Sequence, residues 1–142
     1  MSIHALGLRT LIYPAPDLAA AKAWWSALLG FEPYFDEPFY VGFDVAGYEL
    51  GLLPDADSQE GAIAYWGVPD VAAAMRTALD AGAAVHQESS EVGGGITTGS
   101  VRTPMGSIVG FIDNPHFAPR TPAIGDRPDV NAMLEEQGSF EE

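Results

Sequence analysis

Cysteine is absent from this chain of 142 residues, which excludes disulfide frameworks and thiolate chemistry. Basic residues are scarce, because six lysines and arginines stand against 20 aspartates and glutamates, for a formal net charge of −14. No basic stripe is available to neutralise phosphates, so we expect neither nucleic acid nor a membrane surface as a partner. This acidity favours solubility, and it would also attract a cationic ligand.

Long hydrophobic runs are missing as well. No apolar run approaches the roughly 20 residues that span a bilayer, and the first residues carry no basic and apolar signal pattern. We therefore expect a soluble, cytoplasmic protein. Hydrophobic residues make up 47% and aromatic residues 11% of the chain, so residues 1–142 are expected to form one globular domain. A single lysine among the basic residues, with many alanines and glycines, indicates a bacterial source.

The most informative feature that is present is an internal repeat. The sequence Ala-Pro-Asp-Leu-Ala-Ala-Ala at 15–21 returns as Val-Pro-Asp-Val-Ala-Ala-Ala at 68–74. Each copy follows an aromatic-bearing strand and continues into a helix that stops at a glycine, Gly30 or Gly82. Such a repeat predicts two copies of one supersecondary unit that bury their faces together. A functional site is then expected in the cleft between the two units.

Both units are predicted to have the element order βαβββ. Module one, about 7–54, is predicted to hold a strand at 7–14, a helix from Asp17 to about Leu29, and strands at 32–35, 39–45 and 48–53, with Asp36 and Glu37 in a turn. Module two, about 62–114, is predicted to hold a strand at 63–68, a helix at 70–81, and strands at 85–89, 96–103 and 107–112. A linker at about 54–61 joins the modules, and a tail at about 115–142 follows with a short helix near 130–137. The first helix shows an apolar stripe that is predicted to face the core: Leu18, Ala21, Trp25, Leu28 and Leu29.

This organisation resembles the vicinal oxygen chelate superfamily, which includes glyoxalase I, extradiol dioxygenases, fosfomycin resistance enzymes and bleomycin resistance proteins. The resemblance covers roughly residues 7–115. It rests on the two Pro-Asp repeats, on Leu28-Leu29-Gly30-Phe31 at the helix end, and on Thr103-Pro104-Met105-Gly106-Ser107 before the last strand. It implies an α+β fold in which two tandem βαβββ modules form a curled, barrel-like mixed sheet with a cleft inside and helices outside. It also implies a homodimer.

The metal-dependent families of this superfamily hold a divalent ion with His, Gln and Glu ligands from the first and last strand of each module. The resemblance carries these positions to Thr10, Ile63, Gly51 and Gly110. Glycine and isoleucine cannot ligate a metal, and threonine is a poor lone donor. We therefore expect that the metal site has been lost and that the protein has no cofactor.

The remaining polar candidates do not restore a metal site. His4, His86 and His116 share no ligand spacing, and we interpret them as surface or locally bonded side chains. Glu49 lies two residues before Gly51, so it shares a strand face with that position and can point into the cleft. Tyr65 and Trp66 are adjacent, so one must face the helices and the other the cleft. The predicted ligand-binding residues, none of them catalytic, are Thr10, Tyr40, Glu49, Tyr65, Trp66 and Phe111.

The leading functional hypothesis is a metal-free protein of the bleomycin-resistance type. It would sequester a cationic or aromatic organic compound without catalysis and so serve antibiotic resistance. One alternative is an enzyme, a metal-dependent lyase, isomerase or dioxygenase with displaced ligands. Another is a non-catalytic dimeric interaction module.

Overall fold

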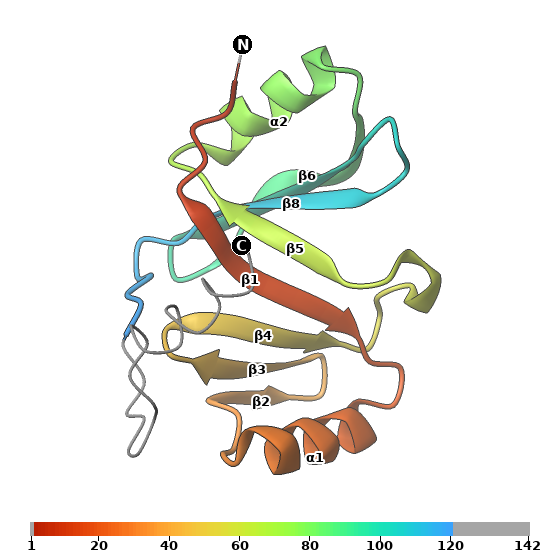
Figure 1. The fold of residues 1–142 in the computed structure, drawn as a ribbon, viewed down its shortest axis with the longest axis vertical. Coiled ribbons are helices and arrows are strands. Elements are labelled where there is room, and N and C mark those ends of the chain that lie inside the picture. The colour runs from red at the N-terminus through yellow and green to blue at the C-terminus, as the bar shows by residue number, and fades with distance from the viewer. Residues whose placement is uncertain (1, 121–142) are drawn as a thin grey trace, which may run out of the picture.

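The computed structural model describes residues 2–120, which form one continuous sheet of eight strands flanked by two helices (Figure 1). The strand order is β2-β3-β4-β1-β5-β8-β7-β6. The first strands of the two modules, β1 (Gly7–Pro14) and β5 (Ile63–Gly67), pair antiparallel at the centre. Each then pairs in parallel with the last strand of its own module. The sheet is therefore two copies of one four-stranded pattern joined edge to edge, which confirms the predicted α+β fold of tandem modules.

In module one, α1 (Leu18–Leu29) lies across one face of the sheet formed by β2 (Phe35–Glu37), β3 (Tyr40–Val45) and β4 (Tyr48–Leu53) (Figure 1). Asp17 caps the helix as predicted, because its carboxylate accepts a 3.1 Å hydrogen bond from the Ala20 amide. Gly30 ends the helix in the left-handed conformation at φ 85°. A buried cluster forms beneath the helix from Ala15, Val41, Phe43, Leu50 and Leu52.

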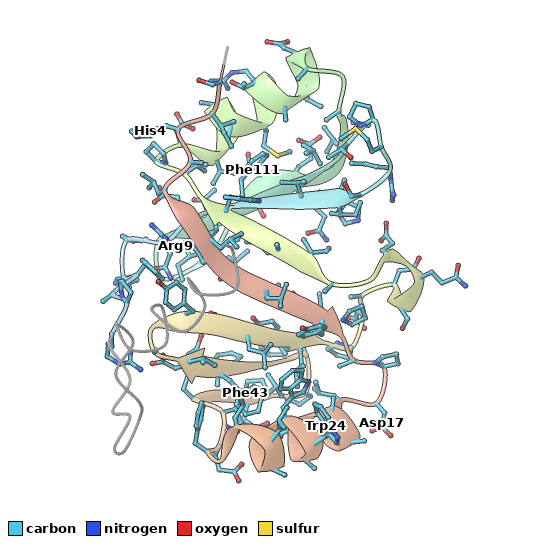
Figure 2. The ribbon with its side chains drawn as sticks, in the orientation of Figure 1. His4, Arg9, Asp17, Trp24, Phe43 and Phe111 are labelled. Carbon is cyan, nitrogen blue, oxygen red and sulfur yellow. The ribbon has the colours of Figure 1, made fainter. Side chains whose placement is uncertain are left out.

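Module two repeats this arrangement after a short 3₁₀ turn, η1 (Ser58–Glu60), in the linker. The helix α2 (Val71–Asp80), capped by Asp70 through the Ala73 amide, covers β6 (Ala84–Gly93), β7 (Ile96–Arg102) and β8 (Ile108–Asp113). Its core cluster is made of Val68, Val71, Ala74, Met75, Val101 and Phe111. Each helix thus packs on its own half of the sheet, with Phe43 in the cluster beneath α1 and Phe111 in the cluster beneath α2 (Figure 2).

Three local predictions were wrong. The first short strand is Phe35–Glu37 rather than 32–35, so Asp36 and Glu37 lie in a strand and not in a turn. Leu28 is 61% exposed, whereas Leu18, Ala21, Trp25 and Leu29 pack against the module-one core as predicted. The strand predicted at 85–89 runs from Ala84 to Gly93. The predicted helix near 130–137 lies outside the described residues, and no helix among those described is long and apolar enough to cross a membrane.

Candidate functional site

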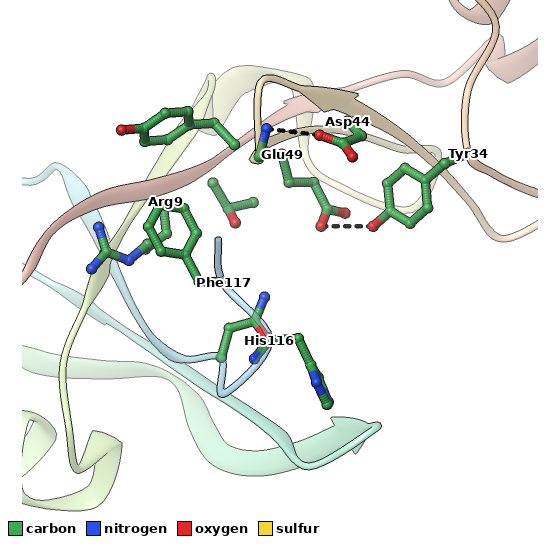
Figure 3. Close-up of a pocket in the computed structure, with 10 residues that line it drawn as sticks. Arg9, Tyr34, Asp44, Glu49, His116 and Phe117 are labelled. Atoms are coloured by element: carbon green, nitrogen blue, oxygen red, sulfur yellow. Dashed lines mark hydrogen bonds between the residues drawn. The ribbon is translucent and has the colours of Figure 1, made fainter. Parts of the chain in front are cut away.

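A small pocket of about 110 Å³ opens on the sheet face opposite α1, beside the start of β4 (Figure 3). Strand β1 contributes Arg9 and Thr10, and the β3–β4 hairpin contributes Asp44, Gly47, Tyr48 and Glu49. The chain that follows β8 forms the other side of the pocket. We call it the Glu49 pocket. Its lining residues are Arg9, Thr10, Tyr34, Asp44, Gly47, Tyr48, Glu49, Asn114, His116 and Phe117.

The carboxylate of Glu49 is held by two phenols. The Tyr34 hydroxyl donates to Oε1 at 2.9 Å, and the Tyr40 hydroxyl donates to Oε2. Gly42 leaves room for these three side chains, because a Cβ at this position would lie 3.0 Å from Glu49 Oε2 and 3.2 Å from Tyr34 Cε1. Within residues 2–120, no lysine, arginine or histidine forms an ion pair with Glu49. A carboxylate with fixed geometry and no cationic partner from this part of the chain thus borders the pocket.

Both phenols are poor acids in this setting. Burial raises the pKa of Tyr40, and the neighbouring Glu49 charge raises it further. The pKa of Tyr34 is also raised, first by burial and then by the Glu49 charge. Tyr34 is largely exposed, but its hydroxyl is turned toward Glu49. Tyr34 and Tyr40 therefore keep their protons at neutral pH and act as hydrogen-bond donors to the carboxylate.

The second acid of the pocket, Asp44, is already paired. Its carboxylate accepts hydrogen bonds from Arg120 at 3.0 and 3.1 Å and from the Gly47 amide at 2.8 Å. These contacts, the Arg120 bond first, lower the pKa of Asp44. The Arg120 amide also donates to Ala46 O, so the chain after β8 is attached to the β3–β4 turn. Asp44 holds this segment in place and is not available to a ligand.

Phe117 forms the wall on the side toward β1. The Arg9 guanidinium carbon lies 3.8 Å from the centre of the Phe117 ring, and the Tyr48 ring meets the same ring edge-on at 5.3 Å (Figure 3). The neighbouring His116 is turned to module two, where its Nε2 lies 2.7 Å from Gly94 O. Residues 114–120, which we call the closing segment, thus connect both modules across the pocket.

The positions that hold the metal in metal-dependent relatives do not fit a divalent ion in this chain. A Cβ at Gly51 would lie 2.7 Å from Tyr40 Cζ, and a Cβ at Gly110 would lie 2.6 Å from Tyr65 Cγ and Cε2. Aromatic side chains therefore occupy the space that ligand side chains would need. The other two positions are Thr10 and Ile63, and residues 2–120 contain no group of three or more His, Cys, Asp or Glu side chains placed to share an ion.

A second polar cluster lies in module two, away from the Glu49 pocket. His86 Nδ1 lies 2.8 Å from the hydroxyl of the fully buried Ser100, and His86 Nε2 lies 3.2 Å from Glu60 Oε1. Arg102 bonds the other oxygen of Glu60. In serine hydrolases the nucleophilic serine bonds Nε2 of the histidine and is open to substrate. Here Ser100 bonds Nδ1 and is buried, so the cluster is not a site of that kind. It ties the linker turn η1 to β6 and β7.

The structure brings only some of the predicted site residues together. Thr10 and Glu49 line the pocket, and the Tyr40 hydroxyl donates a hydrogen bond to Glu49. Tyr65 is buried over Gly110 on the same sheet face. Trp66 pairs across the strands with Phe111, which is buried in the core beneath α2, so both belong to the opposite face. Trp66 and Phe111 are therefore not in the cleft.

Several pocket residues were missed by sequence reasoning. Arg9 sits at an irregularity in the pairing of β1 with β5, which obscures the direction of its side chain. Tyr34 precedes a strand whose bounds were misassigned. Asn114, His116 and Phe117 follow the last strand, and only the return of the chain over the sheet places them here. Glu49 was indicated by its position two residues before Gly51 on one strand, and the missed residues have no such spacing to a predicted site position.

Several solved structures have similar folds. A methylmalonyl-CoA epimerase variant from Streptomyces coelicolor has a TM-score of 0.63 at 17% identity, covering 83% of this chain and 99% of that one. The Mn(II)-bound glyoxalase from Novosphingobium aromaticivorans has a TM-score of 0.63 at 16% identity, covering 88% and 44%. A glyoxalase/bleomycin resistance protein/dioxygenase superfamily member from Vibrio splendidus 12B01 has a TM-score of 0.58 at 20% identity, covering 75% and 97%. At these identities the likeness shows the fold alone.

No curated protein matches the chain. A family model does match, over residues 6–122, which includes both modules and the closing segment. With the tandem βαβββ topology, this match shows that the chain belongs to the Glyoxalase/Bleomycin resistance protein/Dioxygenase superfamily.

Proposed function

We propose that this protein is a metal-free binding protein of the glyoxalase/bleomycin-resistance type that holds a small organic cation without reacting with it. The observation that carries the proposal is Glu49, whose carboxylate borders a pocket and accepts hydrogen bonds from Tyr34 and Tyr40. An ammonium or guanidinium group would complete the coordination of that carboxylate. Charge-assisted hydrogen bonds of this kind are stronger than neutral ones.

The surroundings of Glu49 support a cation over an anion. Asp44, the other acid of the pocket, is paired with Arg120, and the Arg9 guanidinium is stacked on Phe117. The hydroxyl of Thr10, opposite Glu49 in the register of β1 and β4, supplies a further acceptor. The net charge of −14 raises the local concentration of cations and their rate of encounter.

The donor set supports binding rather than metal-assisted catalysis. Tyr40 and Tyr65 fill the space over Gly51 and Gly110, and the remaining two family positions offer one threonine hydroxyl. No reaction step is therefore assigned to a metal at this site. Sequestration needs only affinity, which a preformed carboxylate in a pocket supplies.

The test is calorimetric titration of the full chain with primary amines, guanidinium compounds and quaternary ammonium compounds, against neutral isosteres. We expect saturable binding of at least one cation class. The Glu49→Gln variant should lose about 10- to 100-fold in affinity, as expected for a hydrogen bond to a charged group. Glu88→Gln is the matched control, because it removes the same charge from an exposed position on β6.

Three results would contradict the proposal. Elemental analysis showing about one transition metal per chain, in protein purified without chelator or tag, would favour the metal-dependent enzyme instead. Failure of every cation class to bind would show that the Glu49 carboxylate does not bind an organic cation. A constant dimer that leaves no access to the pocket would favour the interaction module.

A further inference from the structure

Three exposed aromatic side chains lie beside the Glu49 pocket at the outer edge of module one. Tyr34 is 60% exposed, Phe35 is 37% exposed and Phe39 is 61% exposed. Their rings form a row, with centroids 6.4 Å apart between Tyr34 and Phe35 and 6.0 Å apart between Phe35 and Phe39. We call these three residues the aromatic ledge. Contiguous exposed apolar surface of this kind marks binding sites more often than isolated side chains do.

The sheet register places Phe35, the middle residue of the ledge, on the same face as Glu49. Phe35 pairs with Gly42, and Gly42 pairs with Gly51, which is two residues from Glu49 on β4. Directly paired residues share a face, and so do residues two apart on one strand. The neighbouring Asp36 confirms the alternation, because it points the other way and bonds Lys22 on α1. Phe35 and the pocket therefore lie on the same side of the sheet, and the Phe39 ring contacts Phe35 from the turn between β2 and β3.

Tyr34 makes the ledge continuous with the pocket. Its hydroxyl donates to Glu49, its side chain lines the pocket, and its ring leads to Phe35. A volume of about 110 Å³ accommodates a cationic head group, and a larger molecule would have to extend beyond the pocket. The Tyr34 side of the pocket presents flat apolar surface for such an extension.

We propose that the ligand of this protein is an organic cation with a flat aromatic body, whose cationic group pairs with Glu49 and whose body stacks on the aromatic ledge. This inference rests on the proposed function and adds the class of compound. Stacked and edge-to-face rings stabilise a complex beyond the burial of their apolar surface alone. The ledge therefore selects aromatic amines over aliphatic amines of equal charge.

A second copy of the chain fits this edge less well. Phe35 lies on the three-residue edge strand β2, Tyr34 precedes this strand, and Phe39 lies in the turn that follows it. The same strand carries Asp36 and Glu37, between Phe35 and Phe39 in the sequence. Charged residues on a short edge strand oppose pairing with another strand. Two chains of net charge −14 would bring these like charges together.

The experiment compares binding of ethylamine, 2-phenylethylamine and naphthylmethylamine to the full chain by calorimetry. We expect affinity to rise with ring size. Phe39→Ala, and separately Phe35→Ala, should weaken naphthylmethylamine binding about tenfold and leave ethylamine binding unchanged. Trp24→Ala is the matched control, because this 60% exposed aromatic residue lies on α1 and so on the other face. Thermal melts check that each variant folds.

The outcomes separate the two proposals. If ethylamine binding depends on Glu49 but an aromatic body adds nothing, the ledge inference is overturned and the proposed function stands. If none of the three amines binds, the ledge inference is overturned, and the titrations with guanidinium and quaternary ammonium compounds decide the proposed function. If sedimentation shows a dimer that Phe39→Ala dissociates, a second copy covers the ledge and the inference is overturned.

Discussion

The ring of Tyr65 lies directly over Gly110, so that a Cβ at position 110 would be 2.6 Å from the Tyr65 ring carbons Cγ and Cε2. The two residues are also partners in the pairing of β5 with β8. In module one Tyr40 covers Gly51 in the same way, although Tyr40 lies on β3 and is not the register partner of Gly51. Both modules thus place a tyrosine on the glycine of their last strand, where metal-dependent relatives carry a ligand.

The first prediction concerns this contact. Gly110→Ala should lower the free energy of unfolding by about 1–3 kcal/mol, because the methyl group displaces the Tyr65 ring from a packed position. The loss should be smaller when the substitution is made in a Tyr65→Ala background, where the ring is gone. Urea denaturation of the four proteins gives the coupling. Equal losses in the two backgrounds would show that the ring does not need the glycine.

The second prediction concerns the tyrosines around Glu49. Burial first, and the Glu49 charge second, raise the pKa of both Tyr34 and Tyr40, so their folded pKa values lie above the unfolded value. Such groups contribute stability that is fully present below the unfolded pKa of about 10 and is lost as pH rises through the folded pKa. Alkaline titration of phenolate absorbance should show both tyrosines ionising late, and Glu49→Gln should make them ionise earlier. An unchanged curve in the variant would show that Glu49 does not act on them.

The third prediction concerns the closing segment. Phe117→Ala should cost about 0.5–1 kcal/mol through the lost stacking on Arg9, and should speed amide hydrogen exchange across 114–120. Arg120→Ala should have the same effect on exchange by removing the contacts to Asp44. Mass spectrometry of exchanged peptides measures both, with the α2 peptide as internal reference. Slow exchange in both variants would mean that other contacts hold the segment.

The fourth prediction concerns the linker. Arg102 first, and His86 second, lower the pKa of Glu60 below its ordinary value of 4.5. This carboxylate therefore contributes stability that is present above the unfolded pKa and is lost as pH falls through the lower folded pKa. Glu60→Gln should lower the melting temperature slightly at neutral pH, and the difference from the wild type should shrink as the pH falls through the lowered folded pKa. A difference that is constant with pH would contradict the assignment.

Local signals in the sequence predicted most of the fold. Asp17 and Asp70 cap their helices as expected, because the capping bond is made within four residues and needs no distant partner. The bounds of β4 were predicted correctly, since alternation and turn residues mark them. The strand Phe35–Glu37 was missed because an edge strand with charged residues has a turn-like composition.

The candidate site was only partly predictable. Glu49 was found from its spacing to Gly51 along one strand, and Thr10 from the ligand position that the family resemblance implies. Both line the pocket. Trp66 and Phe111 were placed in the cleft, but the register of β5 and β8 turns them to the other face. A shift of one residue reverses every side chain of a strand, and composition does not reveal that register.

The sequence by itself determined the duplication, the two capped helices, the acidic charge and the glycines at positions 51 and 110. Each of these is a property of a short segment or of the chain as a whole. Only the tertiary structure decided that Tyr40 and Tyr65 cover those glycines and that Phe117 returns to wall the Glu49 pocket. These contacts join segments far apart in the chain. Their geometry depends on sheet register and chain return, which are settled by the packing of the whole domain.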